Sequence, residues 1–211
     1  MLDLVQGSPE WLAARCGSLG ASQVADALAK TKTGWGASRA NAKARIITER
    51  LTGRPVETFT TPAMMRGTEM EPVARAMYSF QTSQDVEEVG IVLHPVIKHT
   101  HCSPDGLIGT AGMVEIKCCG AARHIEILTG DKPEDRYIKQ CLWQMACTGR
   151  EWVDLAYFNP DLPEAMQLHV TRIDRDDAVI TEMEDQVAAF LAEVAGAVAD
   201  LEARYSQTEA A

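Results

Sequence analysis

The stretch that decides the fold is Ser103-Pro104-Asp105-Gly106, followed after eight residues by Glu115-Ile116-Lys117. The first part favours a turn, and the second lies in the apolar segment GMVEIKC, which is typical of a β-strand. Because side chains alternate between the two faces of a strand, Glu115 and Lys117 are expected to share one face. If the two segments form neighbouring strands, Asp105 approaches both of these side chains from the adjoining strand.

Two carboxylates and an ammonium group around one point have a specific chemical use. Asp105 and Glu115 repel one another unless a cation lies between them, and such hard oxygen ligands suit Mg²⁺ or Mn²⁺. Lys117 would lie beside a metal-bound water, where it would orient the water or help it to lose a proton. This set suits metal-assisted hydrolysis of a phosphodiester.

Each part of this pattern also has an ordinary structural explanation. An Asp-Gly pair is by itself a signal for a hairpin turn. A Glu-x-Lys sequence is common on the solvent face of an antiparallel strand, and short motifs often match by chance. The context favours the metal site, because the strand of Glu115 and Lys117 is otherwise apolar and follows a turn that carries Asp105.

The flanking sequence predicts one α/β domain over residues 1–211, with a mixed central sheet flanked by helices. Ser8-Pro9-Glu10 is a helix start, and Ser38 is expected to cap a helix that ends at Gly53. Further helices are predicted over about 22–30, 63–79 with Pro72 as a kink or new turn, and 133–148. Strands are predicted within 86–95, 97–106, 112–118, 151–160 and 165–173. A long acidic helical segment, single or broken, is expected from about residue 174 to residue 204.

Composition excludes several classes of protein. The chain has 211 residues, 46% of them hydrophobic and 24% charged, which suits one globular domain. No run approaches the roughly 18 apolar residues of a membrane span. The N-terminal residues lack the basic and apolar regions of a secretory signal, and the six cysteines lack zinc-site spacing. We therefore expect a cytoplasmic protein with reduced thiols.

The charge is unevenly distributed along the chain. The net charge is −10, but residues 1–60 carry a local charge of +3 and residues 161–211 a local charge of −9. This separation leaves room for a basic surface near the N-terminus. The net charge therefore neither supports nor excludes a polyanionic partner.

Five segments in a fixed order resemble a known family. They are SPEWLAAR with GASQVADAL, MRGTEMEPVARAMY, HCSPDG, VEIKC and YIKQCLWQMACTG. Together they resemble the YqaJ-like viral recombinases, the family of lambda exonuclease, over about residues 8–160. The resemblance implies a restriction-endonuclease-like core of the PD-(D/E)xK type. It also implies processive 5′-to-3′ digestion of duplex DNA, which releases mononucleotides and leaves a 3′ single-stranded tail for recombination by strand annealing.

The resemblance also implies roles for residues of the central motif. Asp105 and Glu115 match metal ligands, Lys117 matches a catalytic lysine, and Ile116 is expected to offer its backbone carbonyl to the same ion. Glu71 in GTEMEP matches a glutamate near a second metal position, acting through water; the alternative is an exposed acid on a helix. The implied cofactor is Mg²⁺, with Mn²⁺ as a substitute and one or two ions per site.

A second set of residues matches a pocket for the 5′-terminal phosphate of the DNA. An arginine fork, hydroxyl groups and an amide are suitable donors for phosphate oxygens, and a serine near a helix start would add a favourable dipole. Each residue also has an ordinary structural explanation: in chain order, a salt bridge at a helix end, a helix cap, a hydrogen bond in a turn and an amide on a helix surface. The four residues are Arg15, Ser22, Ser103 and Gln140.

The segment around Trp35 is basic and has an aromatic tip. Lys32 and Arg39 flank Trp35, and together they could hold the DNA backbone or stack on a frayed base. The alternative is a loop whose tryptophan folds back onto the core. The resemblance is weakest here and assigns no contact.

The expected partners also follow from the resemblance. A domain of this size has a radius of gyration of about 17 Å and cannot enclose a duplex alone, so a homotrimeric ring is implied. A single-strand annealing protein and a phage or prophage origin inside a bacterium are implied as well, with no membrane partner. The alternatives are a structure-specific endonuclease of the same fold and a non-catalytic DNA-binding subunit.

Overall fold

The computed structural model describes residues 1–32, 34–57 and 59–206. Its main sheet has five strands in the order β10 (Leu168–Asp174), β9 (Trp152–Phe158), β8 (Gly112–Cys118), β7 (Gly106–Ile108) and β4 (Val86–Glu87). The β8–β9 pair is parallel and the other pairs are antiparallel, so the sheet is mixed as predicted. A three-stranded sheet, β1 (Leu19–Gly20), β6 (Thr100–Cys102) and β5 (Val92–Leu93), lies beside it.

The parallel β8–β9 pair requires a crossover, because a tight turn can join only antiparallel neighbours. Helices α5 (Ala121–Leu128) and α6 (Asp135–Thr148) form that crossover. Glu134 is the N-cap of α6, and Gly149 ends the helix with a φ of 71°. The connection places α6 against the sheet face that carries Glu115.

The two faces of β8 and β9 pack against different helices. Met113 and Leu155 belong to a core cluster with Trp143 of α6 and Phe190 of α7 (Asp177–Tyr205). Val114, Ile116, Ala156 and Phe158 belong to a second cluster with Tyr78 of α4 (Pro62–Thr82). This alternation confirms the predicted period of two, with helices covering both faces of the sheet.

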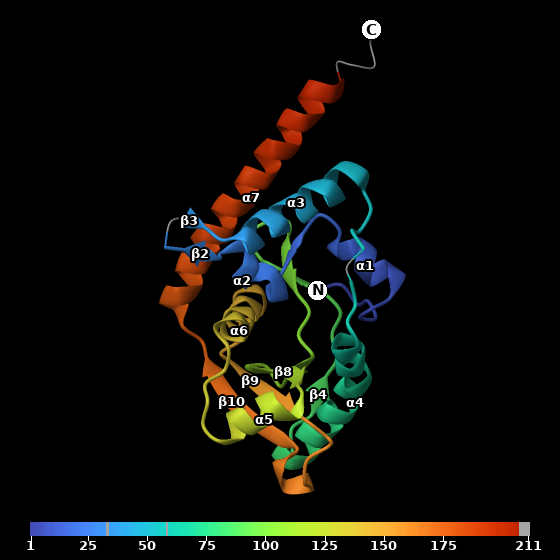
Figure 1. Cartoon of the computed structure of the whole chain (residues 1–211), viewed down its shortest axis with the longest axis vertical. Coiled ribbons are helices and arrows are strands. Elements are labelled where there is room, and N and C mark those ends of the chain that lie inside the picture. Colours follow the sequence, from blue (N-terminus) through green and yellow to red (C-terminus); the bar gives the residue numbers. More distant parts are fainter. Residues whose placement is uncertain (33, 58, 207–211) are drawn as a thin grey trace.

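Two helices near the N-terminus complete the framework (Figure 1). Helix α1 (Pro9–Arg15) begins as predicted, because the Ser8 side chain accepts a hydrogen bond from the Trp11 backbone N–H. Helix α3 (Ala37–Thr52) packs beside α7, which continues past it as one long projecting helix. Gly53 ends α3 in the left-handed conformation, as predicted.

Several predicted elements differ in the structure. The helix expected over 22–30 is only the 3₁₀ turn η1 (Ala21–Gln23) and α2 (Val24–Ala27). Lys30 instead begins a small hairpin, β2 (Lys30–Thr31) with β3 (Gly34–Trp35), although residue 33 lies outside the described residues. Gly36, not Ser38, is the N-cap of α3. Helix α5 was not predicted.

The segment 86–95 is also not one strand. It divides into β4 and β5, which belong to different sheets. The N-terminal chain crosses between them at Gly90, where a Cβ would lie 2.5 Å from the carbonyl oxygens of Leu2 and Leu4. Glycine is required because the two backbones approach closely.

Helix α4 runs unbroken through Pro72, although Pro72 supplies no backbone N–H to it. The six cysteines are free thiols. In the described part of the chain, no helix is both long enough and apolar enough to cross a membrane.

Candidate active site

Asp105 stands immediately before β7, at the open end of the β7–β8 hairpin. The turn of that hairpin lies at residues 109–111, so the Asp-Gly pair does not form the hairpin turn predicted for it. Its Oδ2 accepts the backbone N–H of Ile116 at 2.6 Å, and its backbone carbonyl accepts Nε of Arg75 at 2.9 Å. Gly106 allows this close packing, since a Cβ there would lie 2.0 Å from Cγ1 of Val86. The carboxylate is thereby held beside the centre of β8.

Glu115 lies on the α6 face of β8 and is 3% exposed. Its Oε1 accepts Nζ of Lys117 at 2.6 Å and Nε2 of Gln140 at 2.6 Å. Its Oε2 accepts a short hydrogen bond from Nε2 of Gln144. Gln140 and Gln144 are four residues apart and share one face of α6. The helix therefore fixes both oxygens of this buried carboxylate.

Lys117 lies between Glu115 of β8 and Gln140 of α6. Its ammonium group contacts Glu115, donates to Oε1 of Gln140 at 3.2 Å and lies 4.6 Å from the centroid of the Tyr137 ring. Burial by itself lowers the pKa of Lys117, but the charges of Glu115 and Asp105 outweigh it and raise that pKa above its ordinary value. Lys117 is therefore a cation in this arrangement.

Glu71 projects from α4 toward the same group of charges. Its Oε1 accepts Nη2 of Arg75 at 2.6 Å. Burial raises the pKa of Glu71, Arg75 opposes this shift, and the charge of Glu115 adds to it. Burial followed by the charges of Glu115 and Glu71 raises the pKa of Asp105 well above its ordinary value. Three carboxylates thus crowd one region, and their repulsion makes ionisation of Asp105 and Glu71 less favourable.

The donor set fits a hard divalent cation. Among the described residues, no three His, Cys, Asp or Glu side chains are placed to hold a metal ion together. The predicted site requires only the carboxylates of Asp105 and Glu115 and the carbonyl of Ile116. The Ile116 N–H faces Asp105, and the N–H and C=O of a strand residue point to the same edge. The Asp105 carboxylate and the Ile116 carbonyl therefore lie at the same edge of β8, and Asp105 and Glu115 line one cavity. Oxygen donors of this kind are the ligands that Mg²⁺ prefers.

A cavity of about 180 Å³ joins this site to the N-terminal part of the chain. It contains all four residues predicted to bind the terminal phosphate, together with two of the predicted catalytic carboxylates. Its lining also includes residues that sequence analysis did not assign. The lining residues are Gln6, Trp11, Arg15, Gly20, Ala21, Ser22, His101, Ser103, Asp105, Glu115 and Gln140.

Arg15 is fixed in this cavity by two of the unassigned residues. Its guanidinium carbon lies 3.8 Å from the centroid of the Trp11 ring, and its Nε donates to Nε2 of His101 at 3.0 Å. Trp11 also donates from Nε1 to Oγ of Ser103 at 3.2 Å. Burial and then the charge of Arg45 lower the pKa of Arg15 to about 10, so the guanidinium stays charged at neutral pH.

The family follows from comparison with known proteins. The model of the YqaJ-like viral recombinase domain matches residues 10–151, which is more than half of the chain. The chain belongs to the YqaJ-like viral recombinase family. The matched region of this YqaJ-like domain contains every residue of the site described above except Gln6 of the cavity lining. Comparison with curated protein sequences gave no match.

Solved structures agree with this membership. The YqaJ-like chain is 46% identical to an alkaline exonuclease from Laribacter hongkongensis, covering 95% of this chain and 100% of that one, with a TM-score of 0.89. The same relative, in complex with dAMP, gives equal values. A phage-related exonuclease from Haemophilus somnus 129PT shares the fold at 11% identity, covering 87% and 96% of the chains, with a TM-score of 0.68. The fold is the restriction-endonuclease-like α/β core.

Ser22 of this YqaJ-like domain was predicted to begin a long helix, and this prediction is wrong. It lies in η1, a single 3₁₀ turn followed by the four residues of α2. The favourable helix dipole expected at this position is therefore smaller than a full helix would supply. Ser22 still lines the cavity and is exposed to solvent.

The predicted DNA-binding loop is divided between exposed and buried residues. Lys32 and Trp35 are exposed on the β2–β3 hairpin. Arg39 is only 4% exposed, and its guanidinium carbon lies 3.7 Å from the Trp35 ring centroid. It donates to the carbonyl of Ala27 and, at 2.8 Å, to Glu193. Arg39 therefore ties the hairpin to α7 and presents no free face to DNA.

Proposed function

We propose that this YqaJ-like protein is a Mg²⁺-dependent exonuclease that digests duplex DNA from 5′ ends. One observation carries the proposal. The same cavity contains the predicted phosphate-binding residues and the carboxylates Asp105 and Glu115. The identity of 46% to an alkaline exonuclease, over nearly the whole chain, supports the same reaction class.

A terminal-phosphate pocket beside the carboxylates would explain digestion in the 5′-to-3′ direction. Arg15, Ser22, Ser103 and Gln140 would bind the terminal 5′-phosphate, and the next phosphodiester bond would then lie near Asp105 and Glu115. Binding at the terminus positions one bond for cleavage, which is the advantage of an oriented substrate. Each cycle would release a 5′-mononucleotide and leave a longer 3′ single-stranded tail.

The chain supplies the ligands and the orientation for hydrolysis. Asp105, Glu115 and the Ile116 carbonyl would hold one cation, and Glu71 would reach it, or a second cation, through water. A bound Mg²⁺ or Mn²⁺ neutralises charge on the phosphate and makes a coordinated water more acidic. Lys117, held as a cation by its carboxylate neighbours, would orient the water and stabilise developing negative charge instead of accepting a proton.

The test uses linear duplex DNA labelled at each 3′ end, with covalently closed circular duplex as the control substrate. With Mg²⁺ we expect mononucleotide release and intact 3′ labels, and we expect no reaction with circles or in EDTA. Asp105→Asn should abolish the reaction. Cleavage of circles would indicate a structure-specific endonuclease instead, and DNA binding without any hydrolysis would indicate a non-catalytic subunit.

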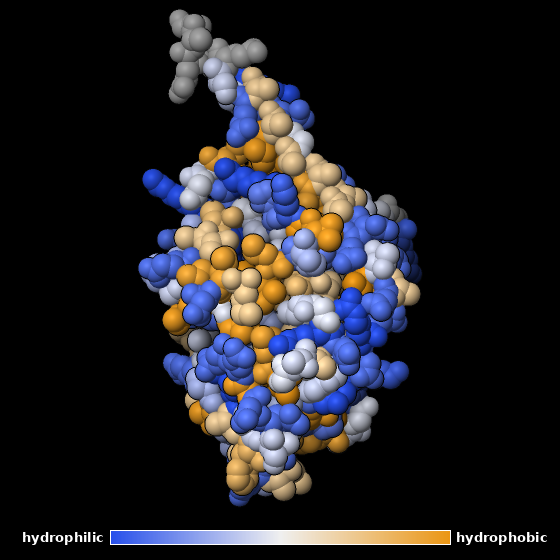
Figure 2. Space-filling model, turned by 180° about the vertical axis from the view of Figure 1, so that it is seen from behind, coloured by the Kyte–Doolittle hydropathy of each residue, from blue (hydrophilic) through white to orange (hydrophobic). Residues whose placement is uncertain are grey.

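Processivity requires that the enzyme stay on the duplex between cycles. We propose a homotrimeric ring, because one domain is too small to enclose a duplex. An apolar patch on the face opposite that of Figure 1 supports a subunit interface (Figure 2). Separately, α4 carries large exposed apolar side chains, among them Met64, Val73 and Phe80. Light scattering should give three times the monomer mass; a monomer at working concentration would contradict the ring.

The biological role proposed is recombination of phage or prophage DNA in a bacterial cytoplasm. The 3′ tail would serve as substrate for a single-strand annealing protein. Co-purification of such a protein with this chain, resistant to nuclease treatment, is the expected result. Loss of association after nuclease treatment would show that DNA alone connects the two proteins.

A further inference from the structure

Arg15 has an unused hydrogen-bonding end. Its Nε is occupied by His101, and one face of its guanidinium lies on Trp11. Within residues 1–32, 34–57 and 59–206, Nη1 and Nη2 have no hydrogen-bond partner. Nη2 lies beside Gly20, where a Cβ would be 3.2 Å away, and Gly20 lines the cavity. The end of the guanidinium fork is therefore available to a ligand in the cavity.

The bond to Arg15 defines the protonation state of His101. A guanidinium group has donors only, so Nε2 of His101 must be the acceptor. The imidazole is then neutral, and its proton lies on Nδ1, which is 3.0 Å from Oγ of Ser18. Burial, followed by the charges of Arg15 and Arg45, lowers the pKa of His101 to about 3. Geometry and electrostatics therefore give the same neutral form.

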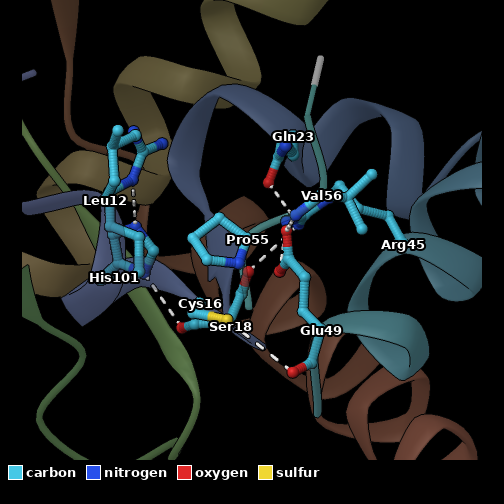
Figure 3. A pocket seen from close by; sticks show the side chains of 10 residues that line it. Leu12, Cys16, Ser18, Gln23, Arg45, Glu49, Pro55, Val56 and His101 are labelled. Carbon is cyan, nitrogen blue, oxygen red and sulfur yellow. Dashed lines mark hydrogen bonds and ion pairs between the residues drawn. The ribbon is translucent and has the colours of Figure 1, made fainter. Parts of the chain in front are cut away.

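The far side of His101 is held by a second network (Figure 3). Figure 3 shows Ser18 and His101 on one wall of a neighbouring cavity, with Arg45, Gln23 and Glu49 opposite. Arg45 donates to the carbonyl of Ser18 at 3.1 Å, to Gln23 at 2.7 Å and to Glu49 at 2.7 Å. The chain of contacts runs from α3 through Ser18 to His101 and ends at Arg15.

We propose that His101 is a positioning residue for the terminal-phosphate site. Its neutral Nε2 binds Nε of Arg15 and directs Nη1 and Nη2 into the cavity, where they form a two-pronged contact with the 5′-phosphate. An arginine held in this way loses less conformational freedom when the phosphate binds. The proposal rests on the proposed function, because it assigns the ligand of Arg15 as that phosphate.

The test compares His101→Leu, His101→Gln, Arg15→Ala and the double variant His101→Leu with Arg15→Ala. Affinity for duplex oligonucleotides with a 5′-phosphate or a 5′-hydroxyl is measured by fluorescence anisotropy in EDTA. His101→Leu should lower the preference for phosphate about tenfold, equivalent to about 1.4 kcal/mol, and leave affinity for the hydroxyl end unchanged. Gln should restore most of the preference, because its amide oxygen can accept from Arg15.

The double variant distinguishes positioning from a separate contact. Once Arg15 is absent, loss of His101 should cause no further loss of preference. Additive losses, or an equal loss for both DNA ends in His101→Leu, would overturn the proposal. A parent protein that prefers phosphate while His101→Leu retains that preference would overturn the role of His101 alone. A parent that degrades DNA without preferring phosphate would overturn the pocket as well.

A measurement on the parent protein does not depend on how well a variant folds. ¹⁵N NMR of the His101 ring should show an unprotonated Nε2 and a protonated Nδ1 at neutral pH. A proton on Nε2, alone or together with Nδ1, would be incompatible with acceptance from Arg15 and would overturn the proposal.

Discussion

Gln144 donates from Nε2 to Oε2 of Glu115, and neither side chain has appreciable access to solvent. The Oε1 atom of Gln144 is buried and has no partner among the described residues. A buried amide with one unmet acceptor is unfavourable, so this arrangement serves the orientation of Glu115 more than the stability of the core. Gln144 was not identified from the sequence, because nothing local connects α6 to β8.

Replacing Gln144 should therefore damage the site more than the fold. We expect Gln144→Leu to lower the rate of hydrolysis at least tenfold, because Glu115 loses the donor to Oε2. The free energy of unfolding should change by no more than about 1–3 kcal/mol. Rates and urea unfolding check this, with Gln186→Leu on the exposed face of α7 as the control. An unchanged rate would show that Glu115 needs no such support.

Removal of the Asp105 charge should separate metal binding from stability. The pKa of Asp105 is raised by burial and by Glu115 and Glu71, so ionisation of this group costs more free energy in the folded protein than in the unfolded chain. Without divalent metal, Asp105→Asn should be the more stable protein, and its advantage should grow as pH rises above the ordinary pKa of 3.8. Calorimetry with Mn²⁺ should show affinity reduced more than about 100-fold. A less stable Asp105→Asn would contradict the proposed crowding.

The depressed pKa of His101 gives a different pH dependence. The unfolded chain takes up the proton near the ordinary pKa of 6.5, but the folded protein does so only near about 3. This group therefore stabilises the fold above pH 6.5, and that stabilisation is lost progressively as pH falls toward 3. Between pH 6.5 and 4, the parent should lose more stability than His101→Gln, by up to about 1.4 kcal/mol per pH unit. The free energy of unfolding, measured in urea at each pH, checks this. If it changes with pH equally in the parent and in His101→Gln, the buried imidazole is not held neutral.

Gly20 offers a way to displace Arg15 without changing its chemistry. A Cβ at Gly20 would lie 3.2 Å from Nη2 of Arg15 and 3.3 Å from Nε2 of His101. Gly20→Ala should therefore shift the guanidinium and reduce the preference for 5′-phosphorylated DNA several-fold. Gly196→Ala, in α7 with no atom within 4 Å of the added carbon, is the matched control. Equal preference in both variants would mean that the pocket tolerates this shift.

The β2–β3 hairpin should show two separate effects. Arg39→Ala should destabilise the fold by about 1–3 kcal/mol, because the buried carbonyl of Ala27 loses its donor. Lys32→Ala should leave stability unchanged but weaken DNA binding and reduce the salt dependence of binding by about one phosphate contact. Thermal unfolding and affinity measured at several salt concentrations check both effects. If the DNA affinity of Lys32→Ala depends on salt as strongly as that of the parent, Lys32 does not contact the DNA.

The sequence was sufficient where the interactions are local. Ser8 caps α1 through a neighbour three residues away, and Gly53 ends α3 by its own conformation. Alternation along β8 placed Val114 and Glu115 on opposite faces. These features depend on dihedral preferences and on the geometry of adjacent residues, which the sequence specifies directly.

Only the tertiary structure decided which distant side chains meet. Gln144 reaches Glu115 because the crossover lays α6 against β8, and His101 reaches Arg15 because β6 pairs with β1 beside the end of α1. Trp11 and Arg15 do share a face of α1, but only the contact with β6 turns them into one wall of a cavity. Such contacts depend on how hydrophobic faces pack across long separations in the chain, and neither spacing nor composition specifies that packing.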